Sequence, residues 1–313
     1  MQIFNLTFLV YGIPCCVLYF LVIATVISMR KNFSSSFNTI FLMTAVVNLG
    51  TWFNTWLTLR LTVEPFFFWY YYWVMTPEIE WFRNIQQFLV SYFYFAQNAC
   101  AFLFTINRFT AICMPSQHQI VRYCSQTLWT TWKWPFILVI HLISLSIPLA
   151  TRWPAIVTYV YDQNTNSFTQ KRGSTINVLT AMICYGSVVM AICIAANVYA
   201  VYCLLKFRAT TKTSKNELSF TLISFCIFLA QTMNISIVIL SAIFVYTANG
   251  AGSAFLSTIT PYTSDIFSLG PPVYTLIVPG PIRNRMRSVV RKTLHLQNSS
   301  SSVSKIVTTI PSR

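Results

Sequence analysis

Charged side chains are scarce in this chain. Asp, Glu, Lys and Arg make up 9% of its 313 residues, whereas a soluble domain usually carries about 25%. So few charges cannot coat a water-facing surface, which argues against a soluble globular enzyme. The aromatic residues, 16% of the chain, argue equally against a disordered or fibrous protein.

Motifs for metal or catalytic chemistry are also missing. None of the nine cysteines belongs to a Cys-x-x-Cys pair, so zinc and thioredoxin-type sites have no support. His118, His141 and His295 lie in separate segments, and only His141 falls inside an apolar run. We interpret His141 as a hydrogen-bonded residue of a helix bundle, with metal binding or proton relay as the alternative. We therefore expect no catalytic residues, no cofactor, no metal site and no enzyme.

Long uncharged runs are what the chain has in abundance. A helix that spans a bilayer needs about 20 mostly apolar residues. Seven runs meet or approach this length, at residues 8–29, 37–59, 84–107, 134–151, 174–205, 218–247 and 254–279. The fourth run is short, and the seventh carries Asp265 and is polar enough to escape a hydropathy window. The predicted fold is an all-α membrane protein, a bundle of seven transmembrane helices.

The basic residues indicate which way the bundle faces. Arg30 and Lys31, the first charges, follow the first apolar run, so the N-terminus is expected outside. Alternate loops then divide the 21 Lys and Arg residues into 16 on the cytoplasmic side and five on the outer side. This asymmetry predicts a cytoplasmic C-terminus, and it accounts for the net charge of +15 without a nucleic-acid partner. Residues 1–290 would form the receptor domain in the lipid bilayer, and residues 291–313 a cytoplasmic tail rich in Ser and Thr.

Asp265 is the most informative single charge. It lies 14 residues, or about 21 Å of helix, from the cytoplasmic end of the seventh run, which places it in the outer half of the membrane. A buried acid is costly unless it is paired or faces a wet cavity. Arg60, at the outer end of the second run, is a candidate partner. The alternative is a ligand that touches Asp265 and its neighbour Tyr262, in a cavity among the outer halves of the third, fifth, sixth and seventh runs.

The outer loops contain an aromatic run but no cysteine. Residues 66–73 read Phe-Phe-Phe-Trp-Tyr-Tyr-Tyr-Trp, which indicates an anchor at the membrane interface or a lid over a ligand cavity. Neither residues 62–84 nor residues 152–173 include a cysteine, so the outer face must be shaped without a disulfide. Asn5 begins the sequon Asn-Leu-Thr and is a candidate glycosylation site.

The inner end of the third run carries Asn107, Arg108 and Phe109. This triplet resembles the Asp/Glu-Arg-Tyr element of rhodopsin-like seven-helix receptors, whose arginine enters the G-protein contact. The resemblance implies that residues 107–109 couple to a heterotrimeric G protein; an arginine that only marks the membrane interface is the alternative. Because Asn107 replaces the acid, any restraint on Arg108 must come from elsewhere.

The seventh run and the segment after it contain two further candidate elements. The run Gly-Pro-Pro-Val-Tyr keeps Pro271 and Tyr274 of a degenerate Asn-Pro-x-x-Tyr element, and a proline that frees a carbonyl predicts a hinge there. After Pro-Gly-Pro come Arg283, Arg285 and Arg287. They predict a basic amphipathic helix that lies on the inner leaflet or contacts the G protein.

Five motifs, taken in order, resemble one family. They are Tyr-Gly-Ile-Pro at residues 11–14, Ser-Ser-Ser-Phe at 34–37, Trp-Phe-Asn-Thr-Trp at 52–56 with Arg60, Asn-Arg-Phe-Thr at 107–110 with Met-Pro at 114–115, and Pro-Gly-Pro-Ile-Arg-Asn at 279–284. Their order and spacing over residues 11–290 resemble nematode serpentine chemoreceptors, most closely class gamma (Srg). The resemblance implies a G-protein-coupled receptor for a small external molecule, in the plasma membrane of sensory-neuron cilia.

Other seven-span functions compete with this interpretation. A ligand-gated channel of the insect odorant-receptor kind has its N-terminus inside, which the distribution of basic residues argues against. A transporter built from two three-helix repeats would show similarity between its halves, and the sequence shows no internal repeat. A structural or assembly role without signalling stays open.

Overall fold

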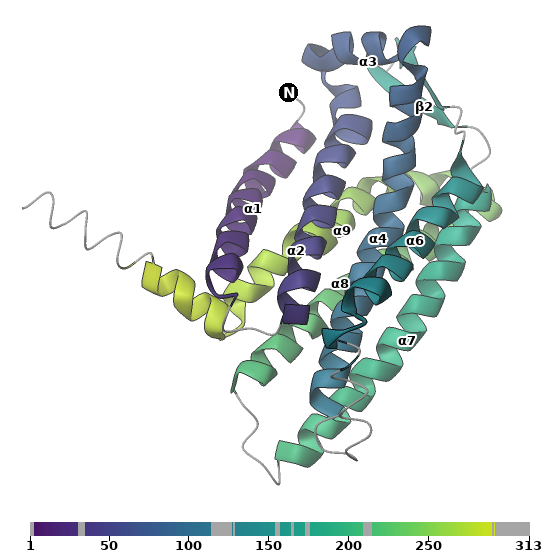
Figure 1. Ribbon diagram of the computed structural model, residues 1–313. Helices are drawn as coiled ribbons and strands as arrows, with labels where there is room; N and C mark the ends of the chain where they lie inside the picture. The colour runs from purple at the N-terminus through teal and green to yellow at the C-terminus, as the bar shows by residue number, and fades with distance from the viewer. Residues whose placement is uncertain are drawn as a thin grey trace, which may run out of the picture.

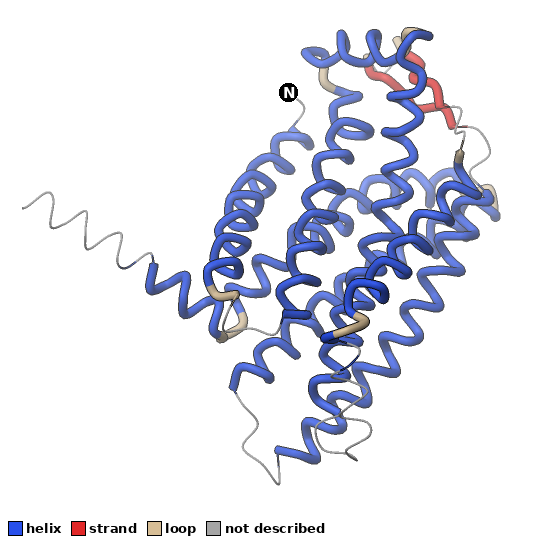
Figure 2. The backbone as a smooth tube through the Cα atoms, in the orientation of Figure 1, coloured by secondary structure: helices blue, strands red, loops and turns tan. Residues whose placement is uncertain are grey.

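The computed structural model describes residues 3–30, 35–113, 127, 129–153, 157–163, 166–172, 176–208, 215–289 and 291. Within these residues, seven long α-helices form a bundle (Figures 1 and 2). They are α1 (Ile3–Ser28), α2 (Ser35–Thr55), α4 (Glu80–Cys113), α6 (Lys133–Arg152), α7 (Ile176–Arg208), α8 (Lys215–Tyr246) and α9 (Gly250–Ile277). A further helical segment, residues 281–289, follows α9.

Six of these helices are long and apolar enough to cross a membrane, as judged over the described part of the chain. The exception is α9, whose 28 residues extend about 42 Å but include Asp265 and three prolines. This length exceeds the roughly 30 Å hydrocarbon core of a bilayer. The expectation that the seventh run escapes a hydropathy window is thus confirmed.

The helix α4 lies at the centre of the bundle and packs against α2, α6, α7 and α8. The helix α9 packs against α8, α1 and α2. On the outer surface of α1, the residues Val10, Ile13, Val17 and Phe20 follow helical spacing, and each is more than half exposed. Such an apolar stripe would be unusual in water, but it is the surface expected of a helix that faces lipid.

The interior of the bundle is rich in aromatic side chains. Phe37 on α2, Phe104 on α4 and Phe220 on α8 belong to one buried cluster. A second cluster includes Trp52 of α2 and reaches α1. At Gly12 of α1, a Cβ atom would lie 2.8 Å from the Trp52 ring, so the glycine allows the two helices to approach closely.

A β-hairpin, which the sequence does not predict, lies at one end of the bundle. Strands β1 (Val157–Asp162) and β2 (Ser167–Arg172) pair antiparallel, with Tyr159 opposite Gln170. β-branched and aromatic residues favour strands, and Asn166 adopts a φ of 48° beside the turn, a conformation that Asn tolerates. The expectation of an all-α chain therefore misses this hairpin.

Short helical turns connect α2 to α4 beside the hairpin. The helix α2 continues as a π-helical turn η1 (Trp56–Arg60) and two 3-10 turns, η2 (Leu61–Val63) and η3 (Pro65–Phe67). The helix α3 (Phe68–Val74) then lies across the end of the bundle, and η4 (Pro77–Ile79) leads into α4 (Figure 1). The N-terminal end of α1 lies at this same end, and residues 281–289 lie at the opposite end (Figure 1).

Candidate functional site

A buried ion pair joins the end of α2 to the middle of α9. Nη2 of Arg60 donates to Oδ1 of Asp265 over 2.6 Å, and the two side chains are 3% and 4% exposed. The hydroxyl of Tyr11, on α1, donates to the other carboxylate oxygen of Asp265. The predicted partnership of Arg60 and Asp265 is therefore confirmed, and a third helix contributes to it.

The π-helical turn η1 places Arg60 inside the bundle. The guanidinium carbon lies 4.1 Å from the centre of the Phe8 ring and 5.3 Å from that of Trp56, so aromatic rings cover the cation. The backbone carbonyl of Arg60 accepts a hydrogen bond from Nδ2 of Asn5 at 2.9 Å, and the same nitrogen lies 2.7 Å from Oε1 of Glu64. The start of α1 thus fixes the turn that carries Arg60.

A cavity of about 710 Å³ opens beside Arg60 within the bundle. Small-molecule sites usually enclose roughly 300–1,000 Å³ and combine apolar walls with a few polar groups. The polar groups here come from six elements and include Asn5, Asn54, Arg60, Gln97, Asn234, Thr260 and Ser264. The predicted cavity lies among α4, α7, α8 and α9; the observed one is lined by these helices and also by α1, α2 and η1.

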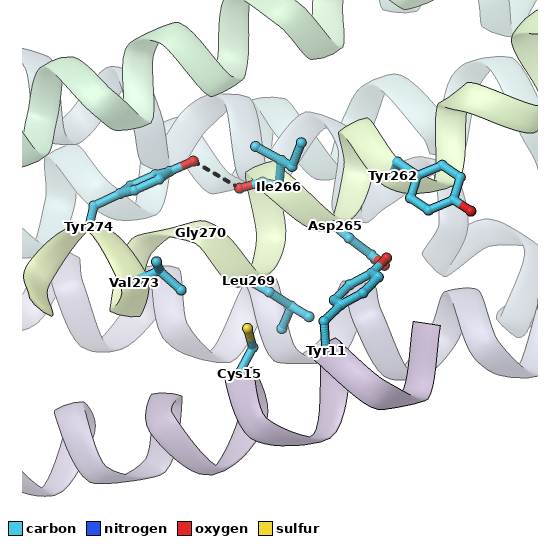
Figure 3. Close-up of a pocket in the computed structure, with 9 residues that line it drawn as sticks. All are labelled: Tyr11, Cys15, Tyr262, Asp265, Ile266, Leu269, Gly270, Val273 and Tyr274. Atoms are coloured by element: carbon cyan, nitrogen blue, oxygen red, sulfur yellow. Dashed lines mark hydrogen bonds between the residues drawn. The ribbon is translucent and has the colours of Figure 1, made fainter. Parts of the chain in front are cut away.

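A second, smaller crevice of about 310 Å³ lies between α1 and α9 (Figure 3). Figure 3 shows the Tyr11 ring directed towards Asp265, with Cys15 one turn further along α1. Tyr262 also lines this crevice, and its ring lies 4.7 Å from that of Phe8. The walls of the crevice are almost wholly apolar, apart from the carboxylate and hydroxyl groups at its outer end.

Asp265 and Tyr262, the predicted ligand contacts, thus line the small crevice and not the large cavity. Residues of α9 that do line the large cavity are Thr260, Pro261 and Ser264. Successive residues of a helix are rotated by about 100°, so Asp265 and Tyr262 lie on a different side of α9 from Thr260, Pro261 and Ser264. Asp265 therefore does not line the large cavity; its partner Arg60 does. The sequence predicts Arg60 only as the partner of Asp265 and not as a residue of the cavity wall.

A chain of buried amides lies below the cavity. Nε2 of Gln97 on α4 donates to Oδ1 of Asn48 on α2 at 3.0 Å and to the Ser268 hydroxyl on α9 at 2.8 Å. Nδ2 of Asn48 donates in turn to the Tyr19 hydroxyl of α1 at 3.0 Å. Because Gln97 also lines the cavity, a group bound there would contact a network that links four helices.

Together with the hairpin, the aromatic run caps the end of the bundle at which α1 begins. We call it the outer cap, because the sequence predicts that this end faces outside. Tyr71 is fully buried between the Tyr159 and Phe168 rings, at centroid distances of 5.1 and 5.4 Å, and burial raises the pKa of its hydroxyl. On the other face of α3, Trp69 is 64% exposed, which suits contact with a membrane interface. One run thus has a buried face within the cap and an exposed aromatic face. The roles of membrane anchor and of lid over a ligand cavity stay predictions.

Hydrogen bonds tie this outer cap to α4 without a disulfide. Nε2 of Gln87 donates to the Tyr159 hydroxyl at 2.9 Å, and Nε2 of Gln86 donates to the Tyr70 hydroxyl at 2.7 Å. Nη1 of Arg83 donates to the backbone carbonyl of Val74 at 3.1 Å. The eight cysteines among the described residues are all free.

At the opposite end of the bundle, Arg108 of α4 is buried against two aromatic rings that also contact each other. Its guanidinium carbon lies 5.1 Å from the centre of Phe37 and 5.0 Å from that of Phe220. Oδ1 of Asn107 accepts a hydrogen bond from the Ser36 hydroxyl at 3.1 Å. Phe109 faces α7 instead, with its ring 5.8 Å from that of Tyr199. Asn107 and Arg108 are therefore buried, whereas Phe109 is half-buried against α7.

The candidate hinge residues lie within α9, which stays helical through Pro271. The hydroxyl of Tyr274 donates to the carbonyl of Ile266 at 3.1 Å, so the ring lies back along the helix over Gly270 (Figure 3). After α9, Nη1 of Arg283 donates to the carbonyl of Ile277 at 3.0 Å. The side chains of the other two predicted contacts, at positions 285 and 287, are exposed.

The remaining candidate sites have different surroundings from those expected. Asn5 is 2% exposed, and its amide nitrogen, the atom that a glycan would occupy, donates to Arg60 and Glu64. In this arrangement Asn5 is a structural link and has no room for a glycan.

Within the described residues, no group of three or more His, Cys, Asp or Glu side chains could hold a metal ion. The predicted Ser/Thr-rich tail, residues 291–313, lies outside the described residues except for residue 291.

The chain matches a known family over most of its length. Residues 5–286 match the family described as Srg family chemoreceptor. The match includes all seven long helices, the outer cap and the buried pair. No curated protein matches the chain.

Proposed function

The chain belongs to the Srg chemoreceptor family, and from this premise we propose that it is a G-protein-coupled receptor that detects a small external molecule. In this proposal, α9 is the seventh span, the N-terminus and the outer cap face outside, and residues 281–289 face the cytoplasm. The receptor would act in the plasma membrane, at a sensory-neuron cilium. Membership of a chemoreceptor family favours a receptor over an enzyme.

The 710 Å³ cavity is the observation that carries the proposal. It lies on the same half of the bundle as the outer cap, and its walls belong to six of the seven long helices or their extensions. A ligand shifts a conformational equilibrium only by its difference in affinity for the two states. A cavity whose walls come from so many helices supports such a difference, because any relative movement of the helices changes its shape.

The inner end supplies the proposed output. Arg108 contacts α2 and α8 through Phe37 and Phe220, so movement of either helix would change its surroundings. The exposed arginines at positions 285 and 287 would add positive charge at the same face. We assign G-protein contact to Asn107, Arg108, Phe109 and this basic segment, and a hinge to Pro271 and Tyr274.

Second-messenger measurement in cells with promiscuous or chimeric Gα subunits tests the proposal. Cells would be screened with volatile and water-soluble compounds, and hits repeated with Arg108→Ala and with Arg30→Ala, an exposed arginine outside the assigned contact. We expect a ligand-dependent signal that Arg108→Ala abolishes at equal surface expression. An evoked current that persists without G protein would point to the channel, and a C-terminal tag accessible from outside would contradict the orientation.

A further inference from the structure

Arg60 has hydrogen-bond donors to spare at the wall of the large cavity. Its Nη2 binds Asp265, but Nε and Nη1 are buried and have no hydrogen-bond partner among the residues that the structure describes. The rings of Phe8 and Trp56 lie against the cation, so a further partner has to reach Nε or Nη1 in the plane of the guanidinium, each from its own side. Buried donors are nearly always satisfied in folded proteins, which marks each of these donors as a place for a ligand atom.

The charge of the pair decides what kind of acceptor fits. Asp265 already balances the charge of Arg60, and Tyr11 binds its second oxygen. A carboxylate ligand would bring an additional negative charge with no further buried cation among the described lining residues to balance it, which is costly in a low-dielectric interior. An amine cation would meet the donors of Arg60 with donors of its own. A neutral oxygen acceptor can satisfy one of the two unpaired donors without either cost.

The remaining wall sets the body of the ligand. Much of it is apolar, with Phe8, Leu59, Val90, Phe93, Met182 and Val238 around the cavity. We propose that the cavity binds a neutral, mainly apolar molecule whose carbonyl, hydroxyl or ether oxygen accepts a hydrogen bond from one of these two donors, Nε or Nη1 of Arg60. This inference rests on the proposed function, since it names the class of ligand that the receptor detects.

Thermal stabilisation of the purified full-length protein in lipid nanodiscs tests the ligand class. The probes are two ketones, acetophenone and cyclohexanone, each with the hydrocarbon of the same shape, α-methylstyrene and methylenecyclohexane. Benzoate and benzylamine serve as the charged probes. Titrating each compound against the unfolding midpoint gives its dissociation constant.

We expect each ketone to bind at least about tenfold more tightly than its hydrocarbon, because only the ketone can accept a hydrogen bond from an unpaired donor of Arg60. Benzoate and benzylamine should bind more weakly than acetophenone. Equal binding of ketone and hydrocarbon, tighter binding of benzoate, or no stabilisation by either ketone would overturn the proposal.

Two variants test the roles of the Arg60 donors and of the charge balance, and a third serves as the control. Arg60→Met/Asp265→Asn removes both charges together, so no buried charge is left unpaired, and it should erase the preference for ketones. Asp265→Asn alone leaves the charge of Arg60 unbalanced, and benzoate should then bind more tightly than acetophenone; an unchanged order would contradict the charge argument. Val17→Ala, on the lipid-facing side of α1, should bind all probes as the wild type does.

The failure of this inference and that of the proposed function give different results. Binding in nanodiscs is measured without a G protein. A ketone that binds through Arg60 but evokes no second messenger would count against the receptor and leave the ligand class standing. A ligand-evoked signal from a charged compound would do the reverse.

Discussion

The guanidinium carbon of Arg108 lies 5.0 Å from the ring centre of Phe220, which connects α4 to α8 through a cation–π contact. Phe37, on α2, flanks the cation at a similar distance and lies 4.6 Å from Phe220 between ring centroids. In the rhodopsin-like element an adjacent acid restrains this arginine. Here Asn107 takes the place of the acid, and two aromatic rings hold the arginine inside the bundle.

Removing a ring should release Arg108 and raise signalling without ligand. A buried cation–π contact is worth about 0.5–2 kcal/mol. If Phe220→Leu removes that energy from the inactive state alone, the active population rises between roughly twofold and thirtyfold. The measurement is basal second-messenger output, normalised to surface expression.

The matched control for this variant lies on the same helix. Phe225 is 39% exposed on α8, and Phe225→Leu should leave basal output unchanged. Output from Phe220→Leu at the wild-type level would mean that the rings do not restrain Arg108. Loss of ligand response in Phe220→Leu without any rise in basal output would also count against the restraint.

The outer cap should be insensitive to reducing agents. It is held to α4 by the Gln87–Tyr159 hydrogen bond and by the packing of Tyr71, and its loops contain no cysteine. A membrane-impermeant phosphine applied to intact cells should therefore leave ligand response unchanged. A rhodopsin-like receptor whose outer loops are joined by a disulfide serves as the positive control. If the Srg chain itself lost its ligand response under the phosphine, it would have to contain a disulfide, and the structure shows none in the described residues.

Alkaline pH should loosen the same cap. Burial is the main cause that raises the pKa of Tyr71 above its ordinary value of about 10. The neighbouring Tyr159 and Tyr70 hydroxyls raise this pKa further. A group with a raised pKa in the folded state contributes stability below its unfolded pKa and loses it as the pH rises further. The unfolding midpoint in nanodiscs should fall above about pH 10 and fall less in Tyr71→Phe. An identical decline in both proteins would exclude Tyr71 as the cause.

Local patterns in the sequence predict the bundle but not its outer end. Uncharged runs of about 20 residues report directly on helices in lipid, because only internally bonded segments are stable there. The seventh helix was predicted in spite of Asp265, since its length and its position after the sixth run carried the information. The hairpin at residues 157–172 was missed because two six-residue strands between long apolar runs resemble a loop, and because their packing partner is the distant α3.

The candidate site shows the same division between local and distant information. Arg60 and Asp265 were predicted as partners because two isolated charges in apolar runs need each other. Their neighbour Tyr11 lies 254 residues from Asp265 in the chain, and no local pattern joins them. The Phe37 and Phe220 rings around Arg108 were likewise beyond prediction, because each looks like any other phenylalanine in an apolar run. The pairing of isolated charges in apolar runs can therefore be predicted from one sequence. The contacts of aromatic side chains can be identified only once the fold is known.

Gly270 and Tyr274 give a prediction whose sign depends on the partner. In a helix, Gly→Ala normally stabilises by about 0.5–1 kcal/mol. At Gly270, however, the added Cβ would overlap the Tyr274 ring and hydroxyl, so the ring would have to leave the helix surface and give up its bond to Ile266. We expect Gly270→Ala to lower the free energy of unfolding by about 1–3 kcal/mol, the usual cost of overpacking.

The same change should have the opposite sign when the ring is absent. In a Tyr274→Ala background nothing occupies the space over Gly270, so Gly270→Ala should stabilise the protein by about 0.5–1 kcal/mol. Unfolding midpoints of the four proteins in this double-mutant cycle measure the coupling directly. Stabilisation by Gly270→Ala in both backgrounds would show that Tyr274 does not rest on Gly270. A reversal of sign, together with weaker ligand response in Gly270→Ala alone, would tie this contact to the proposed hinge, because the ring position would then affect both stability and signalling.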